Sequence, residues 1–324
     1  MKAWSVGLGV GLLGAVVMGI RHGLKARESQ GLPENVAPPE FSPRIFYSSF
    51  GEIFYRVAGE GAPLIFVHSV GVGAASFEWR LVYERFARSH RVMAIDLIGF
   101  GESRRPAVAL DADDYARTLA EFIRGICEST RPVVVASGLS AGFSLKMAAH
   151  HPEIAERIIA LVPESADWLG NVKQPWGIRL AGKLPGLNRF LYQNYLASRG
   201  SIRRWLEEAG FADRSQVTQE LVETYFGFAR QAGAEHAIFQ YIRGKLGVNL
   251  EQLMPDLTLP VHLIWSRNRK MASIKAGEEL CEQTTHATLD ILENSGLLAA
   301  LEVPDEVSAL LERLLNGPAL RVVE

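Results

Sequence analysis

The sequence predicts an α/β protein with a mostly parallel, twisted sheet, helices on both of its faces and an inserted helical cap. Short apolar runs rich in β-branched residues recur along the chain, which is typical of strands buried on both faces. Amphipathic patterns of helical spacing separate these runs, and this alternation favours parallel strands joined by helices. Residues 166–253 differ, because they carry helical patterns rich in Trp, Tyr, Arg and Gln, and we expect them to form the cap.

The predicted core occupies residues 44–165 and 254–324, on either side of the cap. It begins with a hairpin, continues with alternating strands and helices, and ends on an amphipathic helix. The expected strands are residues 44–50, 53–57, 63–68, 92–96, 132–136, 158–162, 260–265 and 287–292, and the expected helices are residues 77–88, 112–127, a helix ending near residue 150, 273–283 and 304–315.

The composition excludes several classes of function. The chain has 324 residues, of which 48% are hydrophobic, so it can bury one large core. Its formal net charge of -2 gives no general attraction to nucleic acid. Cys127 and Cys281 are too few and too isolated for a disulfide framework or a metal cluster, and we expect neither a metal nor a cofactor.

Residues 1–23 are predicted to form an uncleaved membrane anchor. Residues 3–20 carry no charge, and as a helix they would rise about 27 Å, which just spans a hydrocarbon core. Basic residues follow this run directly, so the positive-inside rule predicts a single-pass protein with a cytoplasmic globular domain. These residues are Arg21, His22, Lys25 and Arg27. A cleaved signal peptide is the alternative, although no small-x-small cleavage site follows the run.

Two further features belong to this N-terminal part. Gly7 and Gly11 form a GxxxG pattern, which would let two anchors pack closely in a homodimer. Residues 24–43 contain four prolines among polar residues and are predicted to form an extended linker without a core of its own. We therefore expect the globular domain to begin near Arg44.

A sequence motif follows the β-branched run Val133–Val135. Residues 138–142 read Gly-Leu-Ser-Ala-Gly, which matches the G-x-S-x-G pattern of a nucleophile elbow. In such an elbow a serine stands on a tight turn between a strand and a helix, and the flanking glycines allow the backbone to crowd around it. The pattern predicts Ser140 as the nucleophile. Such a serine needs a base, usually histidine, and a carboxylate that orients the base.

With three further segments, this motif resembles the α/β-hydrolase fold family over residues 44–315. Val67–Gly71 resembles the family's oxyanion loop, Asp96–Ser103 resembles its D-x-x-G-x-G-x-S segment, and Pro260–Trp265 resembles the strand that precedes its acid loop. The resemblance implies a serine hydrolase acting on esters. It also implies that the backbone N–H groups of Val70 and Ala141 form the oxyanion hole.

The sequence departs from the family where the rest of the catalytic triad is expected. Arg269 occupies the place of the acid after residues 260–265, and Leu297 occupies the place of the histidine. Ser69 also replaces the usual glycine of the oxyanion loop. The triad is therefore predicted to be incomplete.

Other residues could take over the missing roles. Glu164 lies just past the strand 158–162, where some members of the family carry their acid. His68 borders the oxyanion loop and is a candidate base, although the corresponding family residue usually has a structural role. His236, in the predicted cap, is a further candidate base.

Three functions remain open from the sequence. The first is a membrane-tethered protein that is weak or inactive as a hydrolase and binds a small apolar or acyl ligand under an aromatic cap. The second is a working serine esterase or lipase-like enzyme that uses Ser140 with a relocated base. The third is a membrane scaffold or interaction module. None of the three involves nucleic acid.

Overall fold

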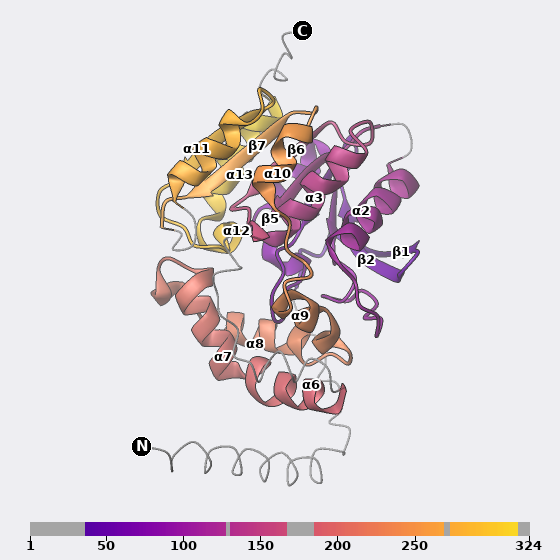
Figure 1. Cartoon of the computed structure of the whole chain (residues 1–324), viewed down its shortest axis with the longest axis vertical. Coiled ribbons are helices and arrows are strands. Elements are labelled where there is room, and N and C mark those ends of the chain that lie inside the picture. The colour runs from indigo at the N-terminus through magenta and orange to yellow at the C-terminus, as the bar shows by residue number, and fades with distance from the viewer. Residues whose placement is uncertain (1–35, 128–129, 167–184, 269–272, 317–324) are drawn as a thin grey trace.

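The computed structural model describes residues 36–127, 130–166, 185–268 and 273–316. Its centre is an eight-stranded sheet with the order β1-β2-β4-β3-β5-β6-β7-β8 (Figure 1). The strands are β1 (Ser42–Ser48), β2 (Gly51–Ala58), β3 (Ala62–Val67), β4 (His90–Ile95), β5 (Val133–Ser137), β6 (Arg157–Leu161), β7 (Val261–Ser266) and β8 (Ala287–Leu292). β1 and β2 pair antiparallel, as does β2 with β4, and all other neighbours are parallel. The predicted α/β fold with a mostly parallel sheet is confirmed.

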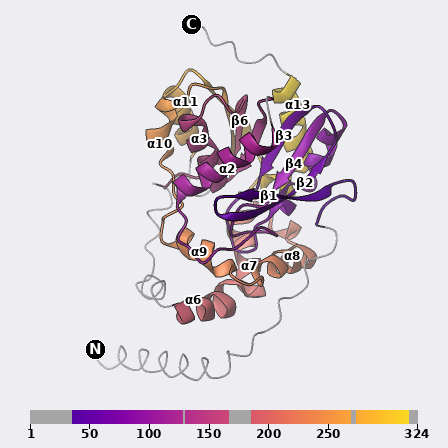
Figure 2. The same ribbon diagram turned by 90° about the vertical axis from the view of Figure 1, so that its right-hand side faces the viewer.

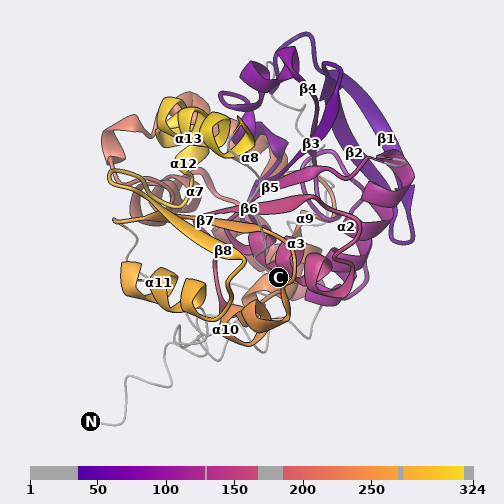
Figure 3. The ribbon, with the colours of Figure 1, turned by 90° about the horizontal axis from the view of Figure 1, so that it is seen from above.

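Helices cover both faces of this sheet. α2 (Ala112–Ile126), α3 (Leu139–His150) and α11 (Ile274–Glu282) share one buried apolar cluster, and α13 (Pro304–Asn316) belongs to a second. In β3 the side chains alternate between them, with Ile65 in the first cluster and Phe66 in the second. In Figure 3, α11 and α13 accordingly lie on opposite sides of β7 and β8.

The helix predicted over residues 77–88 is instead two 3-10 helices, η1 (Ser76–Trp79) and η2 (Tyr83–Arg88). The N–H of Arg80 bonds to the carbonyl of Phe77, and the N–H of Val82 bonds to that of Trp79. Trp79 and Val82 are both buried, and a spacing of three residues brings them to the same side of a 3-10 turn. These bonds between residues three apart close 3-10 turns in place of the i to i+4 bonds of the expected α-helix.

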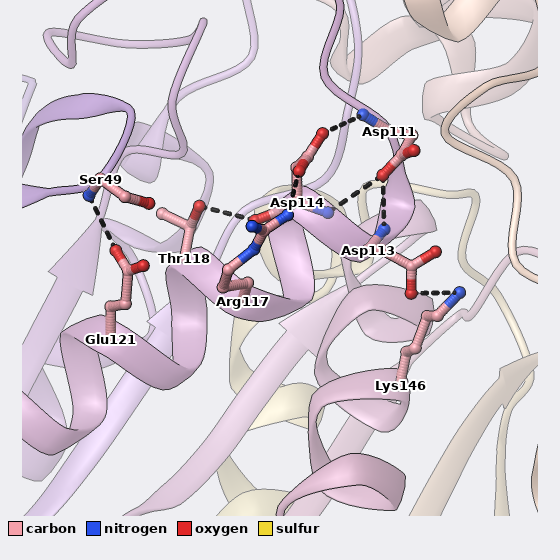
Figure 4. Close-up of polar contacts among 8 residues, drawn as sticks. All are labelled: Ser49, Asp111, Asp113, Asp114, Arg117, Thr118, Glu121 and Lys146. Atoms are coloured by element: carbon pink, nitrogen blue, oxygen red, sulfur yellow. Dashed lines mark hydrogen bonds and ion pairs between the residues drawn. The ribbon is translucent and has the colours of Figure 1, made fainter.

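The start of α2 shows why this segment is helical (Figure 4). The Asp111 carboxylate accepts hydrogen bonds from the N–H groups of Asp113 and Asp114, and the Asp114 carboxylate accepts one from the N–H of Asp111. Such a capping box satisfies donors that lack partners within the helix. Lys146 of α3 forms an ion pair with Asp113 at 2.7 Å, which joins the two helices beside the sheet.

The inserted segment forms a separate helical layer at one end of the sheet (Figures 1 and 2). Its elements are α6 (Pro185–Leu191), the π-helical turn η3 (Tyr192–Leu196), α7 (Arg199–Trp205), the π-helical turn η4 (Leu206–Gly210), the 3-10 turn η5 (Arg214–Gln216), α8 (Gln219–Ala229) and α9 (Ala234–Ile242). The chain returns to the core through α10 (Leu250–Leu253) and η6 (Met254–Asp256). We call α6 to α9 the cap.

Close backbone contact fixes the cap against the loop after β3. A Cβ on Gly73 would lie 2.1 Å from the carbonyl oxygen of Tyr225 in α8, so a side chain at this position would collide with the cap. The φ of Gly73 is +83°, which other residues rarely adopt. The cap thus packs directly on the loop after β3, two residues beyond the predicted oxyanion loop.

The N-terminal prediction is only partly covered by the described residues. In the part of the chain that the structure describes, no helix is long and apolar enough to cross a membrane. The predicted anchor over residues 1–23, including Gly7 and Gly11, lies outside the described residues. The folded part begins slightly before the expected boundary, because β1 starts at Ser42 and the buried Phe41 ring lies 4.3 Å from that of Tyr83.

Candidate active site

The turn between β5 and α3 is formed by a glycine. β5 ends at Ser137 and α3 begins at Leu139, and between them Gly138 has φ 57° and ψ -129°. A nucleophile elbow places its nucleophile on this sharp, strained turn between strand and helix. The residue that stands on the turn of this chain therefore has no side chain.

Ser140 lies two residues beyond the turn, in the first turn of α3, and its predicted placement on the elbow is wrong. The side chain is fully buried, and Oγ donates to the carbonyl oxygen of Ser137 at 2.8 Å. A second carbonyl oxygen, that of Val67, lies 3.4 Å from the same Oγ. The G-x-S-x-G pattern is present, but its serine is turned back onto the backbone of the strands beside it.

One of the two predicted oxyanion donors changes for the same reason. The N–H of Ala141 donates to the carbonyl oxygen of Gly138 at 3.3 Å, so this group closes the first turn of α3. The residue directly after the turn is Leu139, the first residue of the helix, where an N–H has no acceptor within the helix. Val70, the other predicted donor, is buried and lines the cavity beneath the cap.

Three predicted positions meet around Gly138. A Cβ on Gly138 would lie 3.1 Å from the Cβ of Ser69, 3.5 Å from Oε2 of Glu164 and 3.6 Å from Cδ1 of Leu297. The turn at Gly138 is thus surrounded by the substituted oxyanion loop, the candidate acid and the residue in the histidine's place. The structure brings together the positions of a triad, but it fills them with Gly, Glu and Leu.

Backbone strain directs Glu164 into this site. Val162, just after β6, has φ 45°, which is an outlier for a β-branched residue. A residue held in such a region destabilises the folded state by about 1–3 kcal/mol, and such residues cluster at functional sites. The N–H of Val162 donates to the carbonyl oxygen of Ile264 at 2.7 Å, and the N–H of Glu164 donates to that of Gly138 at 3.2 Å. These bonds hold the distorted segment in place, and Glu164 is only 4% exposed.

A second buried carboxylate lies behind the turn. Oε2 of Glu78 in η1 accepts hydrogen bonds of 2.8 Å from both the N–H and the hydroxyl of Ser69. Burial raises the pKa of Glu78 and the negative charge of Glu164 acts in the same direction, whereas Ser137 and Ser69 lower it. Sequence reasoning missed Glu78, and the available signal was its position between the apolar residues Phe77 and Trp79.

His68 is a structural residue, and its predicted role as a base is wrong. Its Nδ1 lies 2.6 Å from the carbonyl oxygen of Ser69, and Nε2 accepts a hydrogen bond of 3.0 Å from the N–H of Leu97. Burial lowers the pKa of His68 below its ordinary value, which favours the neutral ring. Both ring nitrogens are therefore engaged by the backbone.

The loop that carries Leu297 is bonded to the cap. The N–H of Leu297 donates to the carbonyl oxygen of Ala209 at 3.2 Å, and that of Leu298 donates to Gly210 at 2.8 Å. The buried Glu302 carboxylate accepts from the N–H of Asp213 at 2.7 Å and from the N–H of Gly296 at 2.5 Å. These bonds hold the loop that carries Leu297 against η4. The other departure from the family, Arg269, lies outside the described residues.

A cavity of about 990 Å³ lies between the core loops and the cap. Such a volume is that of a small-molecule site. Trp205 of the cap lines it, whereas Tyr195 is 58% exposed. The lining is mostly apolar and consists of Val70, Gly71, Val72, Glu164, Leu196, Ser201, Ile202, Trp205, Glu207, Glu208, Ala209, Phe211, Ala212, Arg214, Ile238, Tyr241, Ile242, Asn268, Gly296 and Leu297. Among the described residues, no group of three His, Cys, Asp or Glu side chains could hold a metal ion.

The strand order, the turn after β5 and the capped cavity define a protein of the α/β-hydrolase class. The profile of the alpha/beta hydrolase family matches residues 64–310, so the chain belongs to this family. Its sequence is 30% identical to 2-hydroxymuconate semialdehyde hydrolase of Pseudomonas sp. (strain CF600) over 169 residues, 51% of this chain and 53% of that protein. The chain thus spans about half the length of that curated relative.

Solved structures show the same fold. A serine hydrolase involved in carbazole degradation superposes with a TM-score of 0.70 at 20% identity, covering 85% of this chain and 98% of the other. A membrane phospholipase A superposes with a TM-score of 0.68 at 20% identity, covering 97% and 99%. These proteins support the fold assignment, while the chemistry of this chain depends on its own residues.

Proposed function

We propose that this chain is a non-hydrolysing member of the alpha/beta hydrolase family that binds a small apolar or acyl molecule in the cavity beneath its cap. The observation that carries this proposal is Gly138 on the elbow. Hydrolysis by the family's route needs a nucleophilic side chain at this turn and an imidazole beside it. Gly138 supplies no nucleophile, and the apolar Leu297 faces the position where an imidazole would have to act.

The family's mechanism is not rescued by Ser140, His68 or Glu164. The remaining candidate base, His236, is not among the residues that line the cavity. The hydroxyl of Ser140 is buried against carbonyl oxygens, and both nitrogens of His68 are bonded to the backbone. Glu164 is near the turn, but a carboxylate is a weak general base for a serine hydroxyl at neutral pH. Without a nucleophile and a base, the covalent route that supplies most of the rate enhancement of such a site is lost.

The same proposal includes a tether to the membrane. Its support is the uncharged run over residues 3–20 followed by basic residues, which favours a single-pass anchor and a cytoplasmic globular domain. Pairing of two anchors through Gly7 and Gly11 would make the tethered protein a homodimer.

Hydrolysis of p-nitrophenyl butyrate by the full-length protein tests the proposal. We expect no turnover above that of a buffer blank, and no change in Ser140→Ala. A triple variant, Ser69→Gly, Gly138→Ser and Leu297→His, is the matched comparison, because it restores a nucleophile, an imidazole and the space between them. Turnover by the unmodified protein that disappears in Ser140→Ala would overturn the proposal in favour of a working esterase.

A further inference from the structure

The cavity has a polar floor as well as apolar walls. Trp205, Ile202 and Ile238 belong to its walls, on the cap side. Glu164 belongs to its floor, and its carboxylate is nine-tenths buried beside the backbone of Gly138. Since a glycine stands on the turn, a bound molecule can approach the Glu164 carboxylate without meeting a side chain from the elbow.

The charged residues that line the cavity are mainly acidic. In the described lining the acidic residues are Glu164, Glu207 and Glu208, and the cation is Arg214. Glu207 also forms an ion pair with Arg203 at 3.4 Å, so its charge is partly compensated. Glu78 lies behind the turn, and burial, with the negative charge of Glu164 as a smaller cause, raises its pKa and favours its uncharged form. A bound carboxylate would meet further repulsion here, whereas a cation would be attracted.

We infer that the ligand of this cavity is an apolar amine whose ammonium group binds the Glu164 carboxylate and whose apolar body lies against Trp205 and the isoleucines of the cap. An ammonium group supplies hydrogen-bond donors and the opposite charge, and charge-assisted hydrogen bonds are about twice as strong as neutral ones. An aromatic body would also suit the indole of Trp205. The volume of about 990 Å³ accommodates a molecule of this kind.

The amine site rests on the proposed binding function and narrows the class of ligand that the cavity binds. Among acyl ligands this excludes a free fatty acid, which would place its carboxylate beside Glu164, and leaves uncharged esters and amides. The strained backbone at Val162 turns the chain after β6 so that Glu164 faces the elbow and can bind the ammonium group.

Isothermal titration calorimetry on the full-length protein with three matched probes tests the amine site. The probes are 1-naphthalenemethylamine, 1-naphthalenemethanol and 1-naphthoate, which carry a positive, no and a negative charge at neutral pH. We expect the amine to bind about ten- to a hundredfold more tightly than the alcohol, as a hydrogen-bonded charge pair allows, and the naphthoate to bind most weakly.

Variants separate the charge of Glu164 from the rest of the cavity. Glu164→Gln keeps the size of the side chain, and we expect it to remove the preference for the amine while the alcohol binds as before. Glu60→Gln, on an exposed loop outside the cavity, is the matched control and should leave all three affinities unchanged. An unchanged alcohol affinity in Glu164→Gln also shows that the variant is folded.

The outcomes distinguish the amine site from the proposed function. Equal affinity for the three probes, tighter binding of the naphthoate, or a preference for the amine that survives in Glu164→Gln would overturn the amine site and leave the binding function standing. Binding of none of the probes up to about 1 mM would overturn the amine site together with a ligand-binding role for this cavity.

Discussion

Replacement of Gly138 by alanine is the most informative stability test of the elbow. Gly138 has φ 57° and ψ -129°, and residues with a Cβ adopt this conformation only under strain. The new Cβ would also lie 3.1 Å from the Cβ of Ser69, which is closer than ordinary van der Waals contact. We therefore expect Gly138→Ala to destabilise the folded state.

The expected magnitude combines two contributions. Backbone strain of this kind costs about 1–3 kcal/mol, and compression against Ser69 adds to it. Ser69→Gly removes the compression but not the strain, so the two substitutions should be non-additive by about 0.5–1 kcal/mol in a double-mutant cycle. Ser69→Gly alone should also destabilise, by about 1 kcal/mol, because the hydroxyl that donates to Glu78 is lost.

Urea unfolding of the full-length protein, followed by tryptophan fluorescence, measures these free energies. Gly200→Ala is the matched control, because a Cβ at Gly200 in α7 meets no atom within 4 Å and alanine favours a helix by about 0.5–1 kcal/mol. The reasoning is refuted if Gly138→Ala is as stable as the unmodified protein, or if its cost does not depend on residue 69.

Three further predictions concern other parts of the site and sheet. Ser140→Ala should lower the free energy of unfolding by about 1 kcal/mol, because it removes the bond to Ser137, and should leave ester hydrolysis at the level of the buffer blank; an unchanged stability would contradict the buried hydrogen bond. Glu302→Gln should speed limited proteolysis within residues 206–213, relative to the exposed control Glu306→Gln, because it weakens the bonds that join the cap to the loop after β8; equal cleavage rates would argue against this connection. Burial lowers the pKa of His262 from 6.5 to about 4, so between these pH values the unfolded chain binds a proton that the folded chain does not. The free energy of unfolding should therefore fall by about 1–3 kcal/mol as the pH drops from about 6.5 to about 4. His262→Asn should flatten this part of the pH profile of stability.

Much of the fold could be predicted because its signals are local and repeated. The buried strands are apolar on both faces, so runs such as residues 133–135 identify them without tertiary information. Amphipathic patterns identify α2, α11 and α13, and α2 also shows its capping residues. The 3-10 helices over residues 76–88 were missed, because helical spacing in so short a run does not distinguish three from 3.6 residues per turn.

The site could be predicted in part only, since a motif does not specify which of its residues stands on the turn. The G-x-S-x-G pattern drew attention to Ser140, yet the strand ends at Ser137 and the next residue is a glycine. That glycine was the available signal, because a tight turn of positive φ is where glycine is expected. The substitution at Leu297 was readable from the sequence, whereas the contact between Ser69 and Gly138 joins segments far apart in the chain and required the structure.

Ser69 and Gly138 both depart from the family pattern, and the two residues form one structural unit. Ser69 adds a side chain on the oxyanion loop, and Gly138 lacks one on the facing turn. The Ser69 hydroxyl in turn binds the buried Glu78, so the space beside the elbow is occupied by a polar network instead of a catalytic pair. In this arrangement the family fold is well packed, and no side chain stands on the elbow turn.

Labelling with a fluorophosphonate probe, followed by peptide mass spectrometry, tests the absence of a catalytic serine most directly. The probe reacts with a serine only when a base activates its hydroxyl. Our account predicts that the full-length protein carries no adduct on Ser140 or elsewhere in residues 133–150. A stoichiometric adduct on Ser140 would contradict it, because it would show an activated nucleophile where the structure places a buried hydroxyl bonded to Ser137.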